Sequence, residues 1–181
     1  MSTPPILETP RLVLRRLAPY DAPALHALLS DPETMQYWSS LPHKDLTETE
    51  AWVAESIAAI ARGDAHDFAV LRDGRLVGRV AFWMGNEIGF IFDRTVWGQG
   101  IAREAATALL RYGFETLGFT SVRADIDPDN KRSQGLLERL GFHQTGFAER
   151  TFNLGGRWTD SAYYELTAEA FGSSSRDGVP A

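Results

Sequence analysis

The most informative stretch of the sequence reads Phe90-Ile91-Phe92-Asp93-Arg94-Thr95-Val96-Trp97-Gly98-Gln99-Gly100-Ile101-Ala102-Arg103-Glu104-Ala105. Its beginning has apolar residues at every second position, which predicts a strand, and its end has them at helical spacing, which predicts a helix. Between the two, Gly98 and Gly100 allow consecutive backbone N–H groups to converge beside the positively polarised N-terminus of that helix. A turn of this kind binds a phosphate group, although two such glycines can also serve only to reverse the chain tightly.

Two other phosphate-binding motifs do not match this stretch. A dinucleotide-binding fingerprint needs a third glycine at the position of Arg103, and it places its glycines directly after the strand. A Walker loop needs a Gly-Lys-Ser or Gly-Lys-Thr ending, which the chain lacks. Both of these nucleotide-binding classes are therefore disfavoured.

Outward from this stretch, periodicity predicts a mixed α/β protein. Asp21 and the capping box Thr47-Glu48-Thr49-Glu50 are expected to start the first two helices, and Asp73-Gly74 predicts a tight hairpin turn. The other helices are expected at 101–112 and 133–140. Seven strands are expected, at 12–17, 68–71, 75–83, 87–92, 121–126, 142–151 and 158–166.

The 181 residues suffice for one domain with a sizeable core. No internal repeat or linker interrupts the chain, so we expect a single domain over residues 1–171. The segment 172–181 is small, polar and unpatterned, and we expect it to be a flexible tail.

Composition excludes several function classes. A net charge of −6 gives no overall basic field for nucleic acid or an anionic membrane, and no run of 18 apolar residues or signal peptide is present, so a cytoplasmic protein is expected. The chain has no cysteine, which excludes disulfides, thiolate metal sites and an acyl-cysteine intermediate. Its four histidines show no metal-binding spacing, and His26 is expected on the surface of its helix. We therefore expect no metal.

At three separated places the sequence resembles the GNAT N-acetyltransferase superfamily. Positions 97–102, Trp-Gly-Gln-Gly-Ile-Ala, fit its acyl-CoA pyrophosphate signature. Positions 130–133, Asn-Lys-Arg-Ser, followed by Leu-Gly-Phe at 140–142, look like its second motif. The opening at 9–15, Thr-Pro-Arg-Leu-Val-Leu-Arg, and Asp31-Pro32-Glu33 are similar to the branch that contains ribosomal-protein alanine acetyltransferases of the RimJ/RimL type. The resemblance covers residues 9–166.

The resemblance implies a mixed, mostly antiparallel seven-stranded sheet flanked by helices and splayed between its fourth and fifth strands, where acetyl-CoA enters. It implies that main-chain groups of the strand contact pantetheine, that the glycine turn holds the pyrophosphate and that a residue of the second motif contacts the coenzyme arm. The strand residues are Phe90, Ile91 and Phe92. The residues of the glycine turn are Trp97, Gly98, Gln99, Gly100, Ile101, Ala102 and Arg103. The residue of the second motif is Asn130. Lys131 and Arg132 are candidates for the 3′-phosphate, with a solvated loop charge as the alternative.

Two departures from the family pattern affect the expected chemistry. The first signature position is Trp97, which should contribute backbone rather than a polar side chain, and the usual tyrosine acid of the second motif is replaced by Leu137. Ser133 is the nearest polar alternative as a catalytic acid, or it caps its own helix. Glu87 resembles in placement the glutamate base of several members, or it is a solvated charge at a strand end.

The expected reaction is direct acetyl transfer from acetyl-CoA to a primary amine, most simply the N-terminus of a protein or peptide. An α-amino group with a pKa of about 7.7–8.0 is neutral in roughly a tenth of molecules at pH 7, whereas a lysine needs about 3.4 kcal/mol more. A small-molecule amine (a polyamine, an amino acid or an aminoglycoside) and a non-catalytic acyl-CoA-binding module are the alternatives. Tyr37, Trp38 and Trp83 are expected to line the acceptor pocket or to be core residues. A monomer or a homodimer is expected.

Overall fold

The computed structural model describes residues 5–176, and the side chains up to residue 173. Within this range the chain divides into two compact units, one ending at Leu109 and the other beginning at Leu110. The two units are described separately.

The first unit contains five antiparallel strands in the order β1-β2-β3-β4-β5. Their bounds are Leu7–Glu8, Val13–Arg16, Ala65–Arg72, Arg75–Trp83 and Glu87–Phe92. The turn between β3 and β4 has Asp73 at φ 51° and Gly74 at φ 76°, which confirms the predicted hairpin. Across the described residues there are eight strands rather than the expected seven. The additional strand β1 has two residues, too few to show any periodicity.

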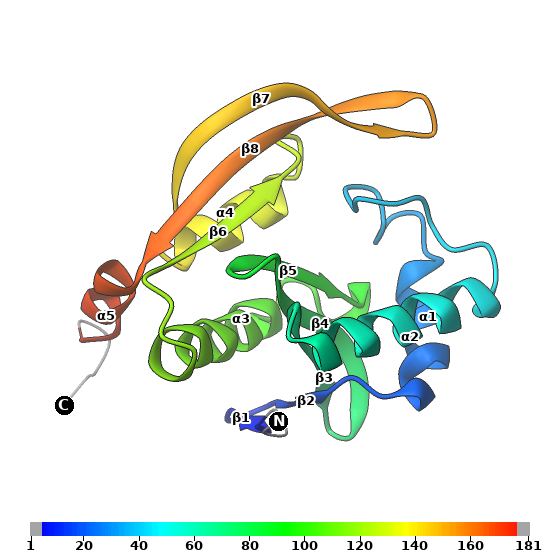
Figure 1. Cartoon of the computed structure of the whole chain (residues 1–181), viewed down its shortest axis with the longest axis horizontal. Coiled ribbons are helices and arrows are strands. Elements are labelled where there is room, and N and C mark those ends of the chain that lie inside the picture. The colour runs from blue at the N-terminus through cyan, green and yellow to red at the C-terminus, as the bar shows by residue number, and fades with distance from the viewer. Residues whose placement is uncertain (1–4, 177–181) are drawn as a thin grey trace. The chain divides into compact units, whose positions relative to one another are not determined.

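Two helices of the first unit join β2 to β3, namely α1 (Ala22–Leu29) and α2 (Leu46–Arg62), after the short 3-10 helix η1 (Pro19–Asp21) (Figure 1). Asp21 stands at the start of α1 but makes no capping bond, because its carboxylate binds the Arg15 guanidinium at 2.7 and 2.8 Å. The start of α2 also differs from the expected capping box. The Asp45 carboxylate caps it by accepting from the amide of Glu48 at 3.0 Å.

The α1 and α2 helices cover one face of the sheet of the first unit. A buried core cluster there includes Leu25 and Leu29 of α1, Val53 of α2 and Ile91 of β5. The hydroxyl of Thr49, which is fully buried, links this layer through bonds of 2.8 Å to Nδ1 of both His26 and His43. His26 is therefore half-buried and bonded rather than surface-exposed, because Thr49 comes from the neighbouring helix. Burial lowers the pKa of His43.

The helix α3 (Ile101–Arg111) starts in the first unit after β5 and the 3-10 helix η2 (Arg94–Val96). It continues into the second unit as a π-helical turn, η3 (Tyr112–Thr116). Its fully buried residues within the first unit are Ile101, Ala105, Ala106 and Leu109. Three of them, Ile101, Ala105 and Leu109, have the helical spacing that the sequence predicts.

The second unit has three antiparallel strands in the order β6-β8-β7, with α4 and α5 (Figure 1). The strands are β6 (Ser121–Ile126), β7 (His143–Leu154) and β8 (Arg157–Thr167), and the helices are α4 (Lys131–Arg139) and α5 (Ala168–Arg176). The hairpin of β7 and β8 turns at Gly155-Gly156, as predicted. Helix α4 contributes the buried Leu136 and Leu137 to the core of this unit, and its C-cap residue, Leu140, is also buried.

The mixed α/β architecture with mostly antiparallel pairing agrees with the sequence. The expected opening between the fourth and fifth strands concerns β5 and β6, one in each unit, and stays a prediction, as does the single domain. Helix α5 includes residues 172–176 of the expected flexible tail, and residues 177–181 lie outside the described residues. None of the helices in the described range is long and apolar enough to span a membrane.

Candidate active site

The turn between β5 and α3 is the part of the first unit where the predicted coenzyme residues gather. Asp93 starts it, and its carboxylate accepts from the amide and the hydroxyl of Thr95, both at 2.8 Å, and from Arg75. Burial tends to raise the pKa of Asp93, but these hydrogen bonds and the charge of Arg75 lower it overall. Arg94 fixes the same turn to the segment after α1 through Asp31 at 3.0 Å and Glu33 at 2.6 Å.

The two glycines of this turn adopt the conformation that the sequence predicts. Gly98 has φ 73° and Gly100 has φ 75°, in the left-handed region that favours glycine. The carbonyl of Gly100 accepts the first helical bond of α3 from the amide of Glu104 at 3.0 Å. Gly100 is thus the N-cap of α3 and offers no side chain to its free N–H groups, whereas Asp45 caps α2 and Asn130 caps α4. This helix N-terminus suits an anion such as a diphosphate.

The main chain of β5 presents alternate residues to its two edges. The amide of Asp93 donates to the carbonyl of Val77 on β4 at 2.9 Å. Because hydrogen-bonded pairs alternate in antiparallel strands, Ile91 also directs its N–H and C=O toward β4, whereas Phe90 and Phe92 direct theirs to the other edge. Phe90 and the amide of Phe92 are therefore directed to the edge where pantetheine contacts are predicted, whereas the carbonyl of Phe92 accepts from the Trp97 indole at 2.9 Å. The main chain of Ile91 is not directed there, because β4 occupies it.

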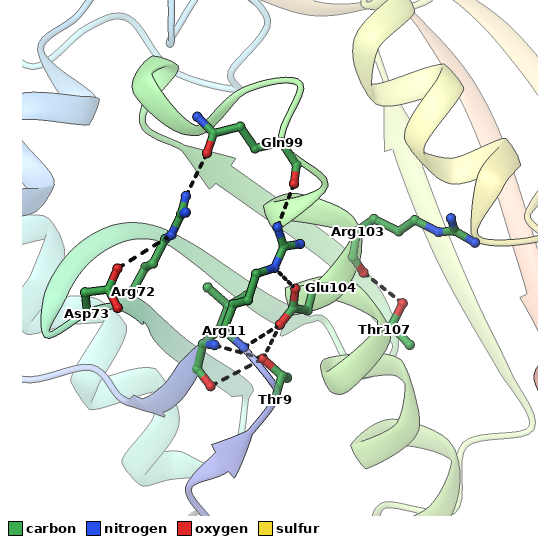
Figure 2. Close-up of polar contacts among 9 residues, drawn as sticks. Thr9, Arg11, Arg72, Asp73, Gln99, Arg103, Glu104 and Thr107 are labelled. Atoms are coloured by element: carbon green, nitrogen blue, oxygen red, sulfur yellow. Dashed lines mark hydrogen bonds and ion pairs between the residues drawn. The ribbon is translucent and has the colours of Figure 1, made fainter.

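Two side chains of the turn hold the turn itself. The indole Nε1 of Trp97 donates to the carbonyl of Phe92 at 2.9 Å, so its polar atom holds the turn, and a backbone contact of Trp97 with the coenzyme stays a prediction. The side chain of Gln99 donates to the carbonyl of Thr95 and accepts from Arg72, both at 2.7 Å (Figure 2). A coenzyme contact from Gln99 would therefore come from its backbone. Arg103 is exposed on the first turn of α3 and extends away from this network (Figure 2).

Glu87 and Trp83 face each other where β4 turns into β5. They form the last register pair of the two strands, and paired residues share a face of the sheet. Both are half-buried, and the Trp83 ring lies over Gly89, whose added Cβ would be 3.6 Å from Cδ1 of the indole. The structure thus brings the candidate base and one candidate acceptor residue together.

A buried ion pair supports this corner of the site. Arg79 and Asp67 are 1% and 0% exposed and are joined by a bond of 2.6 Å from Nη2 to Oδ2. The guanidinium of Arg79 lies 4.6 Å from the ring centre of Trp52 and 4.8 Å from that of Trp83. Burial raises the pKa of Asp67, against the influence of Arg79. Arg79 therefore holds two indoles in place by cation–π contacts.

The same two tryptophans line a groove of about 780 Å³ between α2 and the turn from β4 to β5. Its wall also includes Arg62, which donates to Glu55 at 2.9 Å and to Asp64 at 2.7 Å. Aromatic rings and carboxylates are suited to a cationic amine. The groove is next to Trp83, but Tyr37 and Trp38 do not line it. Trp38 instead packs on the core cluster, and the Tyr37 hydroxyl accepts from Gln36 at 3.2 Å.

The second unit contains the residues of the second motif. The side chain of Asn130 caps α4 by accepting from the amide of Ser133 at 3.1 Å, so Asn130, not Ser133, is the capping residue. Ser133 is half-buried, and its catalytic role stays a prediction. Leu137 is fully buried in the core of this unit. Lys131 is the first residue of α4, and its ammonium group donates to the carbonyl of Pro128 at 2.8 Å; its contact with the 3′-phosphate stays a prediction.

Sequence reasoning missed three polar groups that periodicity does not reveal. They are the Arg79–Asp67 pair, the contacts of Glu104 with the segment before β2, and Asp125 of β6. Burial raises the pKa of Asp125, while a hydrogen bond with Ser161 opposes the change. A polar residue inside an otherwise apolar strand was the available signal for Asp67 and Arg79. Among the described residues no cluster of His, Asp or Glu is arranged to hold a metal ion.

The fold and the glycine turn together define a class of protein. Strand β5 leads through the glycine turn to the N-terminus of α3, which no side chain caps and which suits the diphosphate of a coenzyme. The carboxylate of Glu87 lies on the same strand. This arrangement suits the acyltransferases that the sequence resembles, which take their acyl group from a coenzyme A thioester.

Comparison with known proteins gives the family. The model described as acetyltransferase (GNAT) domain matches residues 11–143. Uncharacterized N-acetyltransferase p20 of Bacillus licheniformis is 30% identical over 168 residues, which cover 88% of this chain and 94% of that protein. The crystal structure of an acetyltransferase (GNAT family) from Bacillus anthracis superposes with a TM-score of 0.81 at 27% identity, covering 91% of this chain and 99% of the other. The chain belongs to the GNAT acetyltransferase family.

A third relative bears on the branch. The [ribosomal protein uS5]-alanine N-acetyltransferase of Escherichia coli is 36% identical over 80 residues, which cover 44% of this chain and 41% of that protein. The predicted family and the mixed α/β fold are confirmed, and this partial match is consistent with the RimJ/RimL-like branch. The protein is an acetyl-CoA-dependent N-acetyltransferase, in which the coenzyme is a co-substrate.

Proposed function

We propose that the protein transfers the acetyl group of acetyl-CoA directly to the α-amino group of a protein or peptide N-terminus, in the cytoplasm. The observation that carries this proposal is the match to the uS5-alanine N-acetyltransferase, whose name gives an alanine as the acceptor. Alanine has no side-chain amine, so an α-amino group is the acceptor that this name suggests. The match spans less than half of either chain, so the acceptor is proposed from it together with the chemistry of the site.

The chemistry of the site supports an acceptor that needs little help to lose its proton. The position of the usual tyrosine acid is the buried Leu137, which has no proton to give. Glu87 is the candidate to accept a proton from the amine, directly or through water. An α-amine is neutral in roughly a tenth of molecules at pH 7, whereas a lysine amine is neutral in well under a hundredth. With one candidate base for the amine, Glu87, the site favours the α-amine, because that amine needs less help to lose its proton than a lysine amine does.

The coenzyme supplies an acetyl thioester, and the chain supplies orientation and proton transfer. The N–H groups of the turn at 98–103 would bind the diphosphate of the coenzyme. The main chain of Phe90 and Phe92, at the edge of β5 that faces away from β4, would bind the pantetheine arm. Glu87 would take the proton that the amine nitrogen loses as its bond to the acetyl carbon forms. The C–S bond then breaks, and the thiolate of CoA takes up a proton. Ser133 is the candidate donor of that proton. A chain without cysteine agrees with direct transfer.

A panel of acceptors tests the proposal. A lysine-free peptide with a free N-terminal alanine is compared with the same peptide bearing a blocked N-terminus and one lysine, and with spermidine. CoA release gives kcat/KM for each, and mass spectrometry locates the acetyl group. We expect the free N-terminus to react fastest. A faster reaction of the blocked, lysine-bearing peptide or of spermidine would overturn the proposed acceptor and leave the acetyltransferase assignment intact.

A further inference from the structure

The segment between β1 and β2 contacts the glycine turn and the first part of α3. Three donors from it converge on the carboxylate of Glu104 (Figure 2). The hydroxyl of Thr9 donates to Oε1 at 2.6 Å, the amide of Arg11 donates to Oε1 at 3.0 Å, and Nε of Arg11 donates to Oε2 at 2.6 Å. More than 90 residues of sequence separate these partners, and all of them lie in the first unit.

The same arginine reaches the peptide bond between the two glycines of the turn. Nη1 of Arg11 donates to the carbonyl of Gln99 at 3.0 Å (Figure 2). In a trans peptide the N–H of the next residue points away from the carbonyl, so this bond aims the N–H of Gly100 in the opposite direction. With glycine on both sides of Gln99, this peptide plane would otherwise turn easily. Arg11 thereby fixes the direction of an amide in the turn.

Glu104 gives the contact a second consequence. It stands four residues after Gly100, in the part of α3 where an uncompensated negative charge would repel a bound diphosphate. Burial alone would raise the pKa of Glu104, but the hydrogen bonds from Thr9 and Arg11 lower it, so the carboxylate is ionised at neutral pH. Arg11 supplies the compensating positive charge.

We propose that Arg11 is a positioning residue for the coenzyme: by holding the Gln99 carbonyl and the Glu104 carboxylate, it sets the amides of the turn at 98–103 for the diphosphate. The proposal rests on the coenzyme role of this turn and is independent of the acceptor. The Arg11 side chain is 43% exposed, and the Glu104 carboxylate, which is 16% exposed, keeps its hydrogen bonds from the Thr9 hydroxyl and the residue-11 amide when that side chain is removed. Its replacement should therefore leave the fold intact.

The variants Arg11→Ala and Arg11→Lys test the proposal, with Arg111→Ala as the matched control. Arg111 has an exposed ion pair with Glu115 at 3.9 Å and no place in the turn. Lysine keeps the charge but, with a single ammonium group, cannot hold both partners as the guanidinium does. Calorimetry gives the affinity for CoA. We expect Arg11→Ala to weaken the affinity for CoA about tenfold. The affinity of Arg11→Lys should lie between those of the wild type and Arg11→Ala, and that of the control should remain within twofold of wild type.

Two further readouts separate positioning from a general structural effect. Amide hydrogen exchange of the free protein should become faster at residues 98–103 in Arg11→Ala and stay unchanged in α2. With S-acetylpantetheine, a donor that lacks the diphosphate, kcat/KM should be the same in wild type and variant, while KM for acetyl-CoA rises at unchanged kcat. Unchanged CoA affinity, unchanged exchange in the turn, or an equal loss with both donors would overturn the proposal.

A double variant at Arg11 and Glu104 separates the two effects assigned to Arg11, namely holding the Gln99 carbonyl and compensating the charge of Glu104. In the Arg11→Ala background, Glu104→Gln removes the negative charge that has lost its guanidinium partner but cannot restore the direction of the Gln99 peptide. We expect it to recover only part of the lost CoA affinity. Full recovery would show charge compensation alone and would overturn the positioning role.

Discussion

The substitution Asp67→Asn would remove the charge that balances a buried arginine. Nε of Arg79 donates to the two carboxylate oxygens of Asp67 at 2.8 and 2.9 Å, and Nη2 donates to Oδ2 at 2.6 Å. Asparagine has one acceptor oxygen in place of two and no charge. The guanidinium would stay enclosed between Trp52 and Trp83 without a counter-charge.

The expected cost follows from this enclosure. Breaking a buried ion pair by neutralising one partner costs roughly 3–5 kcal/mol, because the other charge remains out of water. For a chain of this size each kcal/mol lowers the melting temperature by about 2–4 °C, so we expect a fall of roughly 6–20 °C. Replacing both partners, as in Asp67→Leu with Arg79→Met, should recover most of the loss because no buried charge remains.

Urea unfolding followed by circular dichroism measures these free energies. Asp73→Asn is the matched control, because it makes the same chemical change at a carboxylate that is 94% exposed. We expect the control to unfold close to wild type. A loss of less than about 1 kcal/mol in Asp67→Asn would refute the reasoning, since it would mean that Arg79 finds water or another partner.

Four other predictions concern the site and its support. Gly100→Trp should abolish measurable CoA binding in calorimetry by obstructing the start of α3, and unchanged affinity would remove the turn from the coenzyme site. Glu87→Gln should lower kcat most at low pH, where the amine most needs a base, and an unaffected pH–rate profile would leave water or another group in that role. Glu104 has a pKa lowered below the unfolded value of about 4.3, so its ionised form stabilises the fold above that pH. The gap in unfolding free energy between wild type and Glu104→Gln should thus be full near pH 7 and shrink as the pH falls through the folded pKa; a constant gap would contradict this. Thr49→Val should cost roughly 1–3 kcal/mol in urea unfolding by leaving His26 and His43 without their shared hydroxyl, whereas Thr49→Ser should cost less.

Local rules accounted for much of the fold. Asp73-Gly74 placed a hairpin where the structure has one, because only a few residue types tolerate positive φ. The period-two pattern at 87–92 and the helical pattern from 101 placed β5 and α3 with little error. Helix starts were less accurate, because a cap depends on which partner its carboxylate finds. Asp21 binds Arg15 instead of its own helix, and Asp45 caps α2 two residues before the expected capping box.

By itself the sequence determined the class of the fold, the glycine turn at 98–100 and the family to which the chain belongs, because each depends on residues close together in the chain. Only the tertiary structure decided which side chains complete the site. Arg11 meets Glu104 and Gln99, Asp67 meets Arg79, and Arg79 meets Trp52 and Trp83, in each case across separate elements. The physical reason is that a charge or an indole gains its partner from packing, and no periodicity along the chain records which distant residue will supply it.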